Sequence, residues 1–325
     1  MNIINYPLNN YTKEDYYSLY NRVVDTFSNN NSVLNICTFG GVNQPGISDI
    51  DLLITFKKDS YFNGNVIGDL SKKEALLFTH GVIALAEQHW YKNKSYALWD
   101  NQKIILGDAP VGDEIILDNE QMRILKKQTA LEFLLTNYID LTLQKEYKTI
   151  KLRDLLQHTK GISYDLDYLA ITNSPIDQYI TTAKDWIANW HHSQPSNHEI
   201  KIWFNNFYKN YEAFMFDLFN ENKLYLPIAD SYHFSKNISL INKSELVFSR
   251  NGYALPSFLI NIFQKKAVKF LNKTNHFEFG APLTNNAENS ILEERIFFFK
   301  EMKKYNKIHF PNLGLLTTSL MSKLV

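Results

Sequence analysis

FGGVNQPGISDIDLLITF, residues 39–56, is the stretch of sequence that decides how the first part of this chain is expected to fold. A glycine pair, Gly40 and Gly41, is followed by a short loop and then by alternating acidic and apolar residues. Side chains two residues apart on a β-strand point to the same face. Asp49 and Asp51 are therefore predicted to project together from one face of a strand. The other face is predicted to pack into a core through Ile50, Leu52, Ile54 and Phe56.

These residue types suit a site for a metal ion and phosphate. Two carboxylates held close together repel each other unless a cation lies between them. Mg²⁺ binds carboxylate oxygens and keeps phosphate oxygens and water as further ligands. Glycines let the backbone approach a ligand closely, and the N–H groups of such a turn can bind a triphosphate. Together the two features indicate chemistry on a nucleoside triphosphate.

The order of apolar residue, glycine pair, loop and Asp-apolar-Asp-apolar resembles the signature of the polymerase-β nucleotidyltransferase superfamily. That group includes aminoglycoside nucleotidyltransferases, minimal nucleotidyltransferases and protein adenylylating enzymes. The resemblance implies that Gly40 and Gly41 contact the triphosphate, and that Asp49 and Asp51 are catalytic and ligate Mg²⁺. The activity it implies is transfer of a nucleoside monophosphate from an NTP to a hydroxyl or phosphate of a small molecule, sugar or protein.

The chain departs from this pattern at the third carboxylate, which the family usually supplies from a later strand. The predicted strand at residues 78–86 carries His80 where that acid is expected. Glu87, Asp100 and Asp108 lie nearby in the sequence, but none has apolar residues on both sides in a strand pattern. A histidine can act as a base near neutral pH, so His80 is the third candidate catalytic residue. The alternative is a catalytically decayed protein that binds nucleotide or a partner and catalyses nothing. For His80 alone, a structural role is the competing interpretation.

Hydrophobic periodicity predicts an α+β fold: a nucleotidyltransferase-type mixed sheet with flanking helices at residues 1–118, and a mainly helical domain at 119–325. The helical domain is expected to shape the acceptor site. Strands are predicted at residues 32–39, 49–56, 78–86, 103–106 and 113–117, with a hairpin at 238–240 and 245–248 around Asn242 and Lys243. Helices are predicted at residues 12–27, 121–147, 149–169 with an interruption near Gly161, 176–191, 199–220 and 291–305. A salt-bridged helix surface is predicted for five residues of the 149–169 segment, and a cleft facing the site is the alternative: Arg153, His158, Tyr164, Asp165 and Asp167.

Composition limits the class of protein. The chain has 325 residues with 34 basic and 34 acidic side chains, and a nucleic-acid binder usually carries a basic excess. An acceptor other than nucleic acid is therefore expected. The single cysteine, Cys37, allows no internal disulfide, and the sequence has neither a signal-peptide pattern nor an apolar run of about 20 residues that could span a membrane. The chain is predicted to be soluble and cytoplasmic. The nucleotidyltransferase half of a toxin–antitoxin pair is a further possibility that the sequence leaves open.

Overall fold

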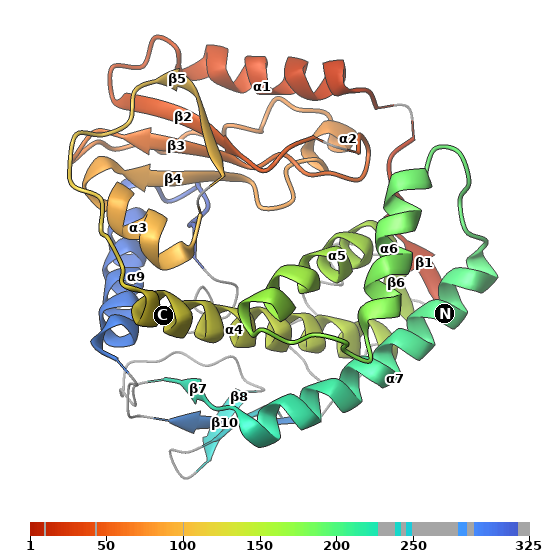
Figure 1. The fold of residues 1–325 in the computed structure, drawn as a ribbon. Coiled ribbons are helices and arrows are strands. Elements are labelled where there is room, and N and C mark those ends of the chain that lie inside the picture. Colours follow the sequence, from red (N-terminus) through yellow and green to blue (C-terminus); the bar gives the residue numbers. More distant parts are fainter. Residues whose placement is uncertain are drawn as a thin grey trace. The chain divides into compact units, whose positions relative to one another are not determined.

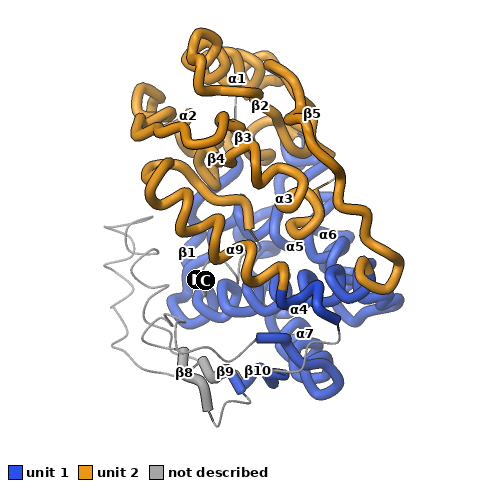
Figure 2. Tube along the Cα trace, turned by 90° about the vertical axis from the view of Figure 1, so that its left-hand side faces the viewer, with its two compact units in different colours: residues 1–7, 123–293, 319–324 blue, residues 8–122, 294–318, 325 orange. Residues whose placement is uncertain are grey.

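The computed structural model describes residues 1–9, 11–42, 44–99, 101–226, 238–241, 245–248, 279–284 and 289–317. They form an α+β structure (Figure 1) that divides into two compact units (Figure 2). Unit 1 comprises Met1–Pro7, Arg123–Glu293 and Ser319–Leu324, and unit 2 comprises Leu8–Met122, Glu294–Thr318 and Val325. The α+β class expected from the sequence is confirmed. The division into domains at residues 118 and 119 stays a prediction.

A four-stranded mixed sheet forms the centre of unit 2 (Figure 1). Its strands are β2 (Val33–Phe39), β3 (Leu52–Phe56), β4 (Val82–Ala86) and β5 (Gln102–Gly107), in the order β4-β3-β2-β5. Strand β3 pairs antiparallel with β2 and parallel with β4, and β5 pairs antiparallel with β2. The mixed sheet with flanking helices is confirmed.

Helix α1 (Lys13–Phe27) packs on one face of this sheet. It begins at Thr12, whose side chain accepts a hydrogen bond from the N–H of Asp15, and the Asp15 carboxylate accepts one from the N–H of Thr12. This reciprocal cap satisfies backbone donors that a helix start otherwise leaves unpaired. The predicted apolar face of β3 is confirmed, because Leu52, Ile54 and Phe56 are fully buried in the same cluster as the apolar side chains of α1. Ile50, which precedes the strand, is buried in this cluster as well.

Unit 2 also contains helix α9 (Ser290–His309) from Glu294 onward, together with the short helix α3 (Trp90–Ala97). The amide of Asn306 in α9 donates a hydrogen bond of 2.9 Å to the carbonyl oxygen of Ala84. Beyond α9, the N–H of Gly314 donates to the carbonyl of Val82, and the N–H of Ala84 donates to the carbonyl of Gly314. These bonds cover the outer edge of β4, which would otherwise expose unpaired backbone groups.

Three strand predictions were wrong: two placed the first residue of the strand too early, and one predicted a strand that does not form. The strand predicted at residues 49–56 begins at Leu52, and the one predicted at 78–86 begins at Val82. Residues 113–117 form no strand. The N–H of Ile50 bonds to the carbonyl of Leu77 and that of Gly81 bonds back to Phe78, so both segments are loops leading into their strands.

Four longer helices make up most of the described part of unit 1: α4 (Asn119–Glu146), which enters it at Arg123, α5 (Leu152–Tyr168), α6 (Asp177–Asn189) and α7 (Asn197–Glu221). Two small sheets accompany them. Strand β1 (Asn2–Ile4) pairs with β6 (Thr149–Lys151), and β7 (Leu224–Tyr225), β10 (Phe279–Thr284), β9 (Glu245–Phe248) and β8 (Ile238–Ile241) pair in that order. The hairpin of β8 and β9 is confirmed, whereas its predicted turn at Asn242 and Lys243 lies outside the described residues.

The segment predicted as one interrupted helix at residues 149–169 differs from the prediction. Its first residues form β6, and α5 then continues through Gly161 without a break. Arg153 is 1% exposed and Asp165 is 7% exposed, so the predicted salt-bridged surface is wrong for both residues. Both side chains belong to the interior of unit 1. None of the helices in the described part of the chain is long and apolar enough to cross a membrane.

Candidate metal centre

The sheet of unit 2 brings three separate segments to one end. Gly40 and Gly41 follow the last residue of β2, and the antiparallel pairing of β2 with β3 places Asp49 and Asp51 beside them. The N–H of Phe39 donates to the carbonyl of Asp51 at 3.2 Å. Because β4 runs parallel to β3, the loop before β4, with His80, lies at this same end.

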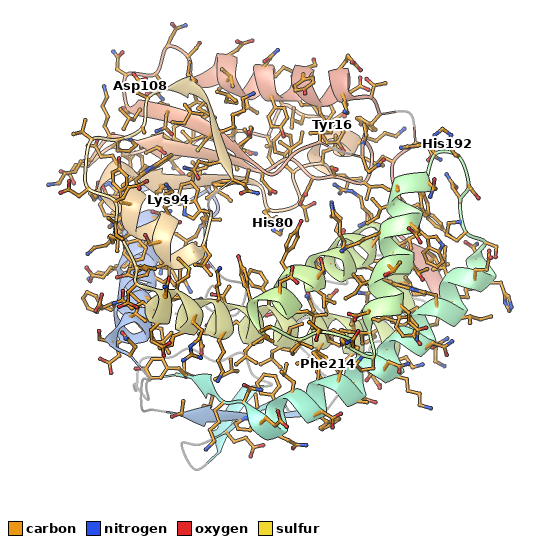
Figure 3. All side chains as sticks on the ribbon, viewed as in Figure 1. Tyr16, His80, Lys94, Asp108, His192 and Phe214 are labelled. Carbon is orange, nitrogen blue, oxygen red and sulfur yellow. The ribbon has the colours of Figure 1, made fainter. Side chains whose placement is uncertain are left out.

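Asp49, Asp51 and His80 form a group suited to a metal ion. Each offers one ligand atom, and these atoms lie within 4.8 Å of one another. The Nε2 atom of His80 is 3.7 Å from Oδ2 of Asp49. The Asp49 side chain is 23% exposed and that of His80 is 60% exposed, so the group opens to solvent on the histidine side (Figure 3).

Tyr16 of α1 holds the loop that carries the acids. Its side chain is fully buried, its hydroxyl donates to the carbonyl of Ser48 at 2.6 Å, and it accepts from the N–H of Gly46 at 2.9 Å. Gly46 has a φ of 82°, and a Cβ atom there would overlap the carbonyl oxygen of Leu8. A residue with a side chain is therefore strained at this position. The sequence marks Tyr16 only as a member of an apolar helix face, and the Pro45-Gly46 pair is the signal that locates the turn.

The acids also affect a neighbouring tyrosine in α1. Burial, followed by the negative charges of Asp51 and Asp49, raises the pKa of Tyr20 to about 12. A tyrosinate beside two carboxylates would be a third negative charge in the same place. Tyr20 therefore stays neutral across the physiological range and contributes no charge to the centre.

The glycine turn at Gly40 and Gly41 is exposed, as a phosphate-binding turn must be, but the conformation of Gly40 gives a structural reason for glycine as well. Gly40 is exposed and has a φ of 62°, a conformation that residues with a side chain rarely adopt, and a Cβ there would meet no atom within 4 Å. Backbone conformation alone therefore explains glycine at this position. Gly41 is likewise exposed, so its backbone is open to a ligand.

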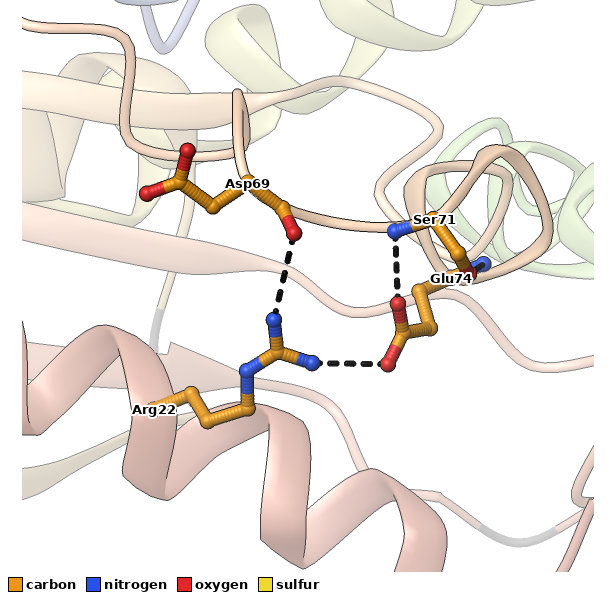
Figure 4. Close-up of polar contacts among 4 residues, drawn as sticks. All are labelled: Arg22, Asp69, Ser71 and Glu74. Carbon is orange, nitrogen blue, oxygen red and sulfur yellow. Dashed lines mark hydrogen bonds and ion pairs between the residues drawn. The ribbon is translucent and has the colours of Figure 1, made fainter.

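The segment leading to His80 is tied to α1 by a polar network (Figure 4). Arg22 of α1 donates to the carboxylate of Glu74 at 2.7 Å and to the carbonyl of Asp69 at 3.4 Å. Glu74 in turn caps helix α2 (Lys72–Ala75) by accepting from the N–H of Ser71. The hydrogen bonds from Ser71, together with the positive charge of Arg22, lower the pKa of the Glu74 carboxyl. Because α2 ends just before Leu77, this network helps to fix the start of the loop that carries His80.

A hollow of about 290 Å³ lies beside the centre, next to His80. Residues from three segments line it, namely 65–67 after β3, 80–82 at the start of β4, and 311–314 after α9. None of these lining residues is an aspartate, glutamate, lysine or arginine, and Asn65 and Asn312 provide amides. The hollow suits a small uncharged group.

Neither of the two described candidates for a third carboxylate, Glu87 and Asp108, lies at the centre. Glu87 follows β4 and accepts from the N–H of Lys58, and Asp108 follows β5, so both lie at the end of the sheet opposite the centre. Asp100 lies outside the described residues. Among the residues that the structure describes, the group is completed by the imidazole of His80.

Comparison of the chain with protein-family models, with curated proteins and with solved structures gives no match. The resemblance to polymerase-β nucleotidyltransferases therefore stays a prediction. Any assignment of function depends on the arrangement of the residues themselves.

Proposed function

We propose that the chain is a metal-dependent nucleotidyltransferase that moves a nucleoside monophosphate from an NTP to an acceptor hydroxyl or phosphate. One observation carries the proposal: the glycine turn at Gly40 and Gly41 and the aspartates at Asp49 and Asp51 lie side by side at one end of a mixed sheet. A turn for phosphate next to ligands for a divalent ion is what transfer from an NTP requires.

Each residue has a distinct role in this proposal. The backbone at Gly40 and Gly41 binds the outer phosphates, and Asp49 and Asp51 hold the divalent ion. When bound, that ion neutralises phosphate charge and activates an attacking oxygen. The donor set fits an ion of this kind, because carboxylate oxygens lie within 4.8 Å of one another and of an imidazole nitrogen. The buried Tyr16 hydroxyl orients the acid loop through Ser48.

The hollow beside His80 supports a small acceptor. In phosphoryl and nucleotidyl transfer the attacking and leaving oxygens lie roughly in line. The strand order places the glycine turn at the end of β2, the acids before β3, and His80 with the hollow beside β4. With the leaving pyrophosphate on the glycine turn, an acceptor would approach from the side of β4. The uncharged lining favours a neutral hydroxyl of a small molecule or sugar over an anionic acceptor.

The test combines a thermal-shift scan with a transfer assay. The purified chain is heated with each of ATP, GTP, CTP and UTP, with and without Mg²⁺ or Mn²⁺, and label transfer from the α-³²P-labelled nucleotides to neutral and phosphorylated sugars is followed. A ligand at about 100 times its Kd stabilises the folded state by roughly 2.7 kcal/mol, which a melting curve resolves readily.

Asp51→Asn is expected to lose both the metal-dependent shift and the label transfer, because it removes a charged ligand. Asp108→Asn is the matched control: it removes an exposed carboxylate at the other end of the same sheet (Figure 3) and should behave as wild type. Full turnover by Asp51→Asn would refute the proposal.

The second candidate function is a nucleotide-binding protein without catalysis. It is favoured by the group itself, in which the described third donor is an imidazole and not a carboxylate. A metal-dependent shift with one NTP, lost in Asp51→Asn but accompanied by no label transfer to any acceptor, would support this function instead.

A further inference from the structure

The histidine in the centre distinguishes it from a site made of oxygen ligands alone. The Nε2 atom of His80 lies 3.7 Å from Oδ2 of Asp49, and the third ligand atom, from Asp51, completes a set within 4.8 Å. Two ligands that each lie about 2.1 Å from one ion are at most about 4.2 Å apart. The Asp49–His80 pair already meets that limit, and the 60% exposed imidazole has room for the small rotation that would close the rest.

The hydrogen bonds of the surrounding backbone favour a preformed centre. Asp49 follows Ser48, whose carbonyl accepts from the buried Tyr16, and Ile50 between the two acids is fully buried and bonded to Leu77. His80 lies three residues beyond Leu77, so the Ile50–Leu77 hydrogen bond directly joins the acid segment to the histidine segment. The nitrogen ligand is therefore held near the carboxylates by the fold itself.

We propose that Asp49, Asp51 and His80 together bind a divalent ion of the first transition series, with Mn²⁺ preferred over Mg²⁺, through two oxygens and one nitrogen. Mg²⁺ is a hard ion that takes oxygen ligands in proteins. Imidazole favours ions further along the first transition series, and Mn²⁺ is the ion of that series that carboxylates also suit. The proposal rests on the proposed function only in assigning a divalent ion to the same aspartates, and it gives His80 the role of a ligand in place of a base.

The experiment measures the ion directly and needs no turnover. Binding of Mn²⁺ to the full chain is followed by the loss of the electron paramagnetic resonance signal of free Mn²⁺, and Mg²⁺ is titrated as competitor. Electron spin echo modulation of the bound ion then reports coupling to ¹⁴N. Wild type is expected to bind Mn²⁺ at least about tenfold more tightly than Mg²⁺ and to show ¹⁴N modulation.

His80→Asp replaces the nitrogen by oxygen and is expected to abolish the ¹⁴N modulation and reduce the Mn²⁺ preference by about tenfold. His192→Asp makes the same exchange at an exposed histidine of unit 1 (Figure 3) and should leave both readouts unchanged. His80→Gln serves if His80→Asp fails to fold, and it should likewise lose the modulation.

Bound Mn²⁺ without ¹⁴N modulation in wild type would overturn the proposal, as would an equal Mn²⁺ preference in wild type and His80→Asp. The outcome is separable from that for the proposed function. Nitrogen-coordinated Mn²⁺ without nucleotide transfer would support His80 as a metal ligand and refute the proposed nucleotidyltransferase activity. Nucleotide transfer with an ion that lacks nitrogen coordination would support the activity and refute His80 as a ligand.

Discussion

Asp165 lies in the interior of unit 1, on α5, and is only 7% exposed. Burial raises the pKa of its carboxyl to about 8. In the unfolded chain the pKa of an aspartate is about 3.9. A group whose folded pKa is raised contributes stability that is complete below the unfolded pKa and is lost as the pH rises through the folded pKa. The folded protein should therefore lose stability between about pH 4 and pH 8.

Asp165→Asn keeps the shape of the side chain and removes the titration. Each pKa unit corresponds to about 1.4 kcal/mol. Between pH 5 and pH 8, the free energy of unfolding of wild type should therefore fall by about 3–4 kcal/mol relative to that of Asp165→Asn. Urea denaturation of both proteins at intervals across this range measures the difference.

The control for this experiment is Asp167→Asn, which removes an exposed carboxylate two residues further along the same helix. Its effect is subtracted to isolate the contribution of burial. A stability difference between wild type and Asp165→Asn that stays constant from pH 5 to pH 8, or that moves in favour of wild type, would refute the reasoning.

Two further predictions concern glycines. Gly161→Ala should raise the urea midpoint and stabilise the protein by about 0.5–1 kcal/mol, because Gly161 lies inside α5 and an added Cβ would meet nothing within 4 Å; a lower midpoint would contradict this. Gly46→Ala should lower the melting temperature more than Gly81→Ala does. Both positions have positive φ, a strain of about 1–2 kcal/mol for alanine, but only at Gly46 would the Cβ also overlap the Leu8 carbonyl; equal decreases would contradict this account.

The local pattern was sufficient to predict β3 and its buried face. Alternation at Leu52, Ile54 and Phe56 is a property of neighbouring residues, and their shared face follows from strand geometry. The residue at which β3 begins could not be predicted in this way, because it depends on where the hydrogen bonds between neighbouring strands begin. The N–H of Ile50 bonds to Leu77, outside the paired region, and no local pattern in the sequence contains that information.

The position of His80 in the site could likewise not be predicted from a local sequence pattern. Its place in the group depends on the parallel pairing of β3 and β4, and these two strands are separated in the sequence by residues 57–81. Arg153 and Asp165 show the limit for burial: charged residues on a predicted amphipathic helix are normally exposed, and only the packing of unit 1 reveals that both are inside.

The return of α9 to unit 2 has a consequence for synthesis of the protein. The sheet and α1 are complete by residue 122, but α9 and Phe310, which is 1% exposed in the core with α1, emerge only after residues 123–293. At a translation rate of 5–20 residues per second that interval is roughly 10–30 s. During that time the nascent sheet lacks the core side chain of Phe310, and the edge of β4 lacks its hydrogen bonds to Gly314. A chaperone that shields exposed apolar surface on the ribosome should therefore bind this nascent chain before residue 294 is made and leave it soon after residue 314 emerges.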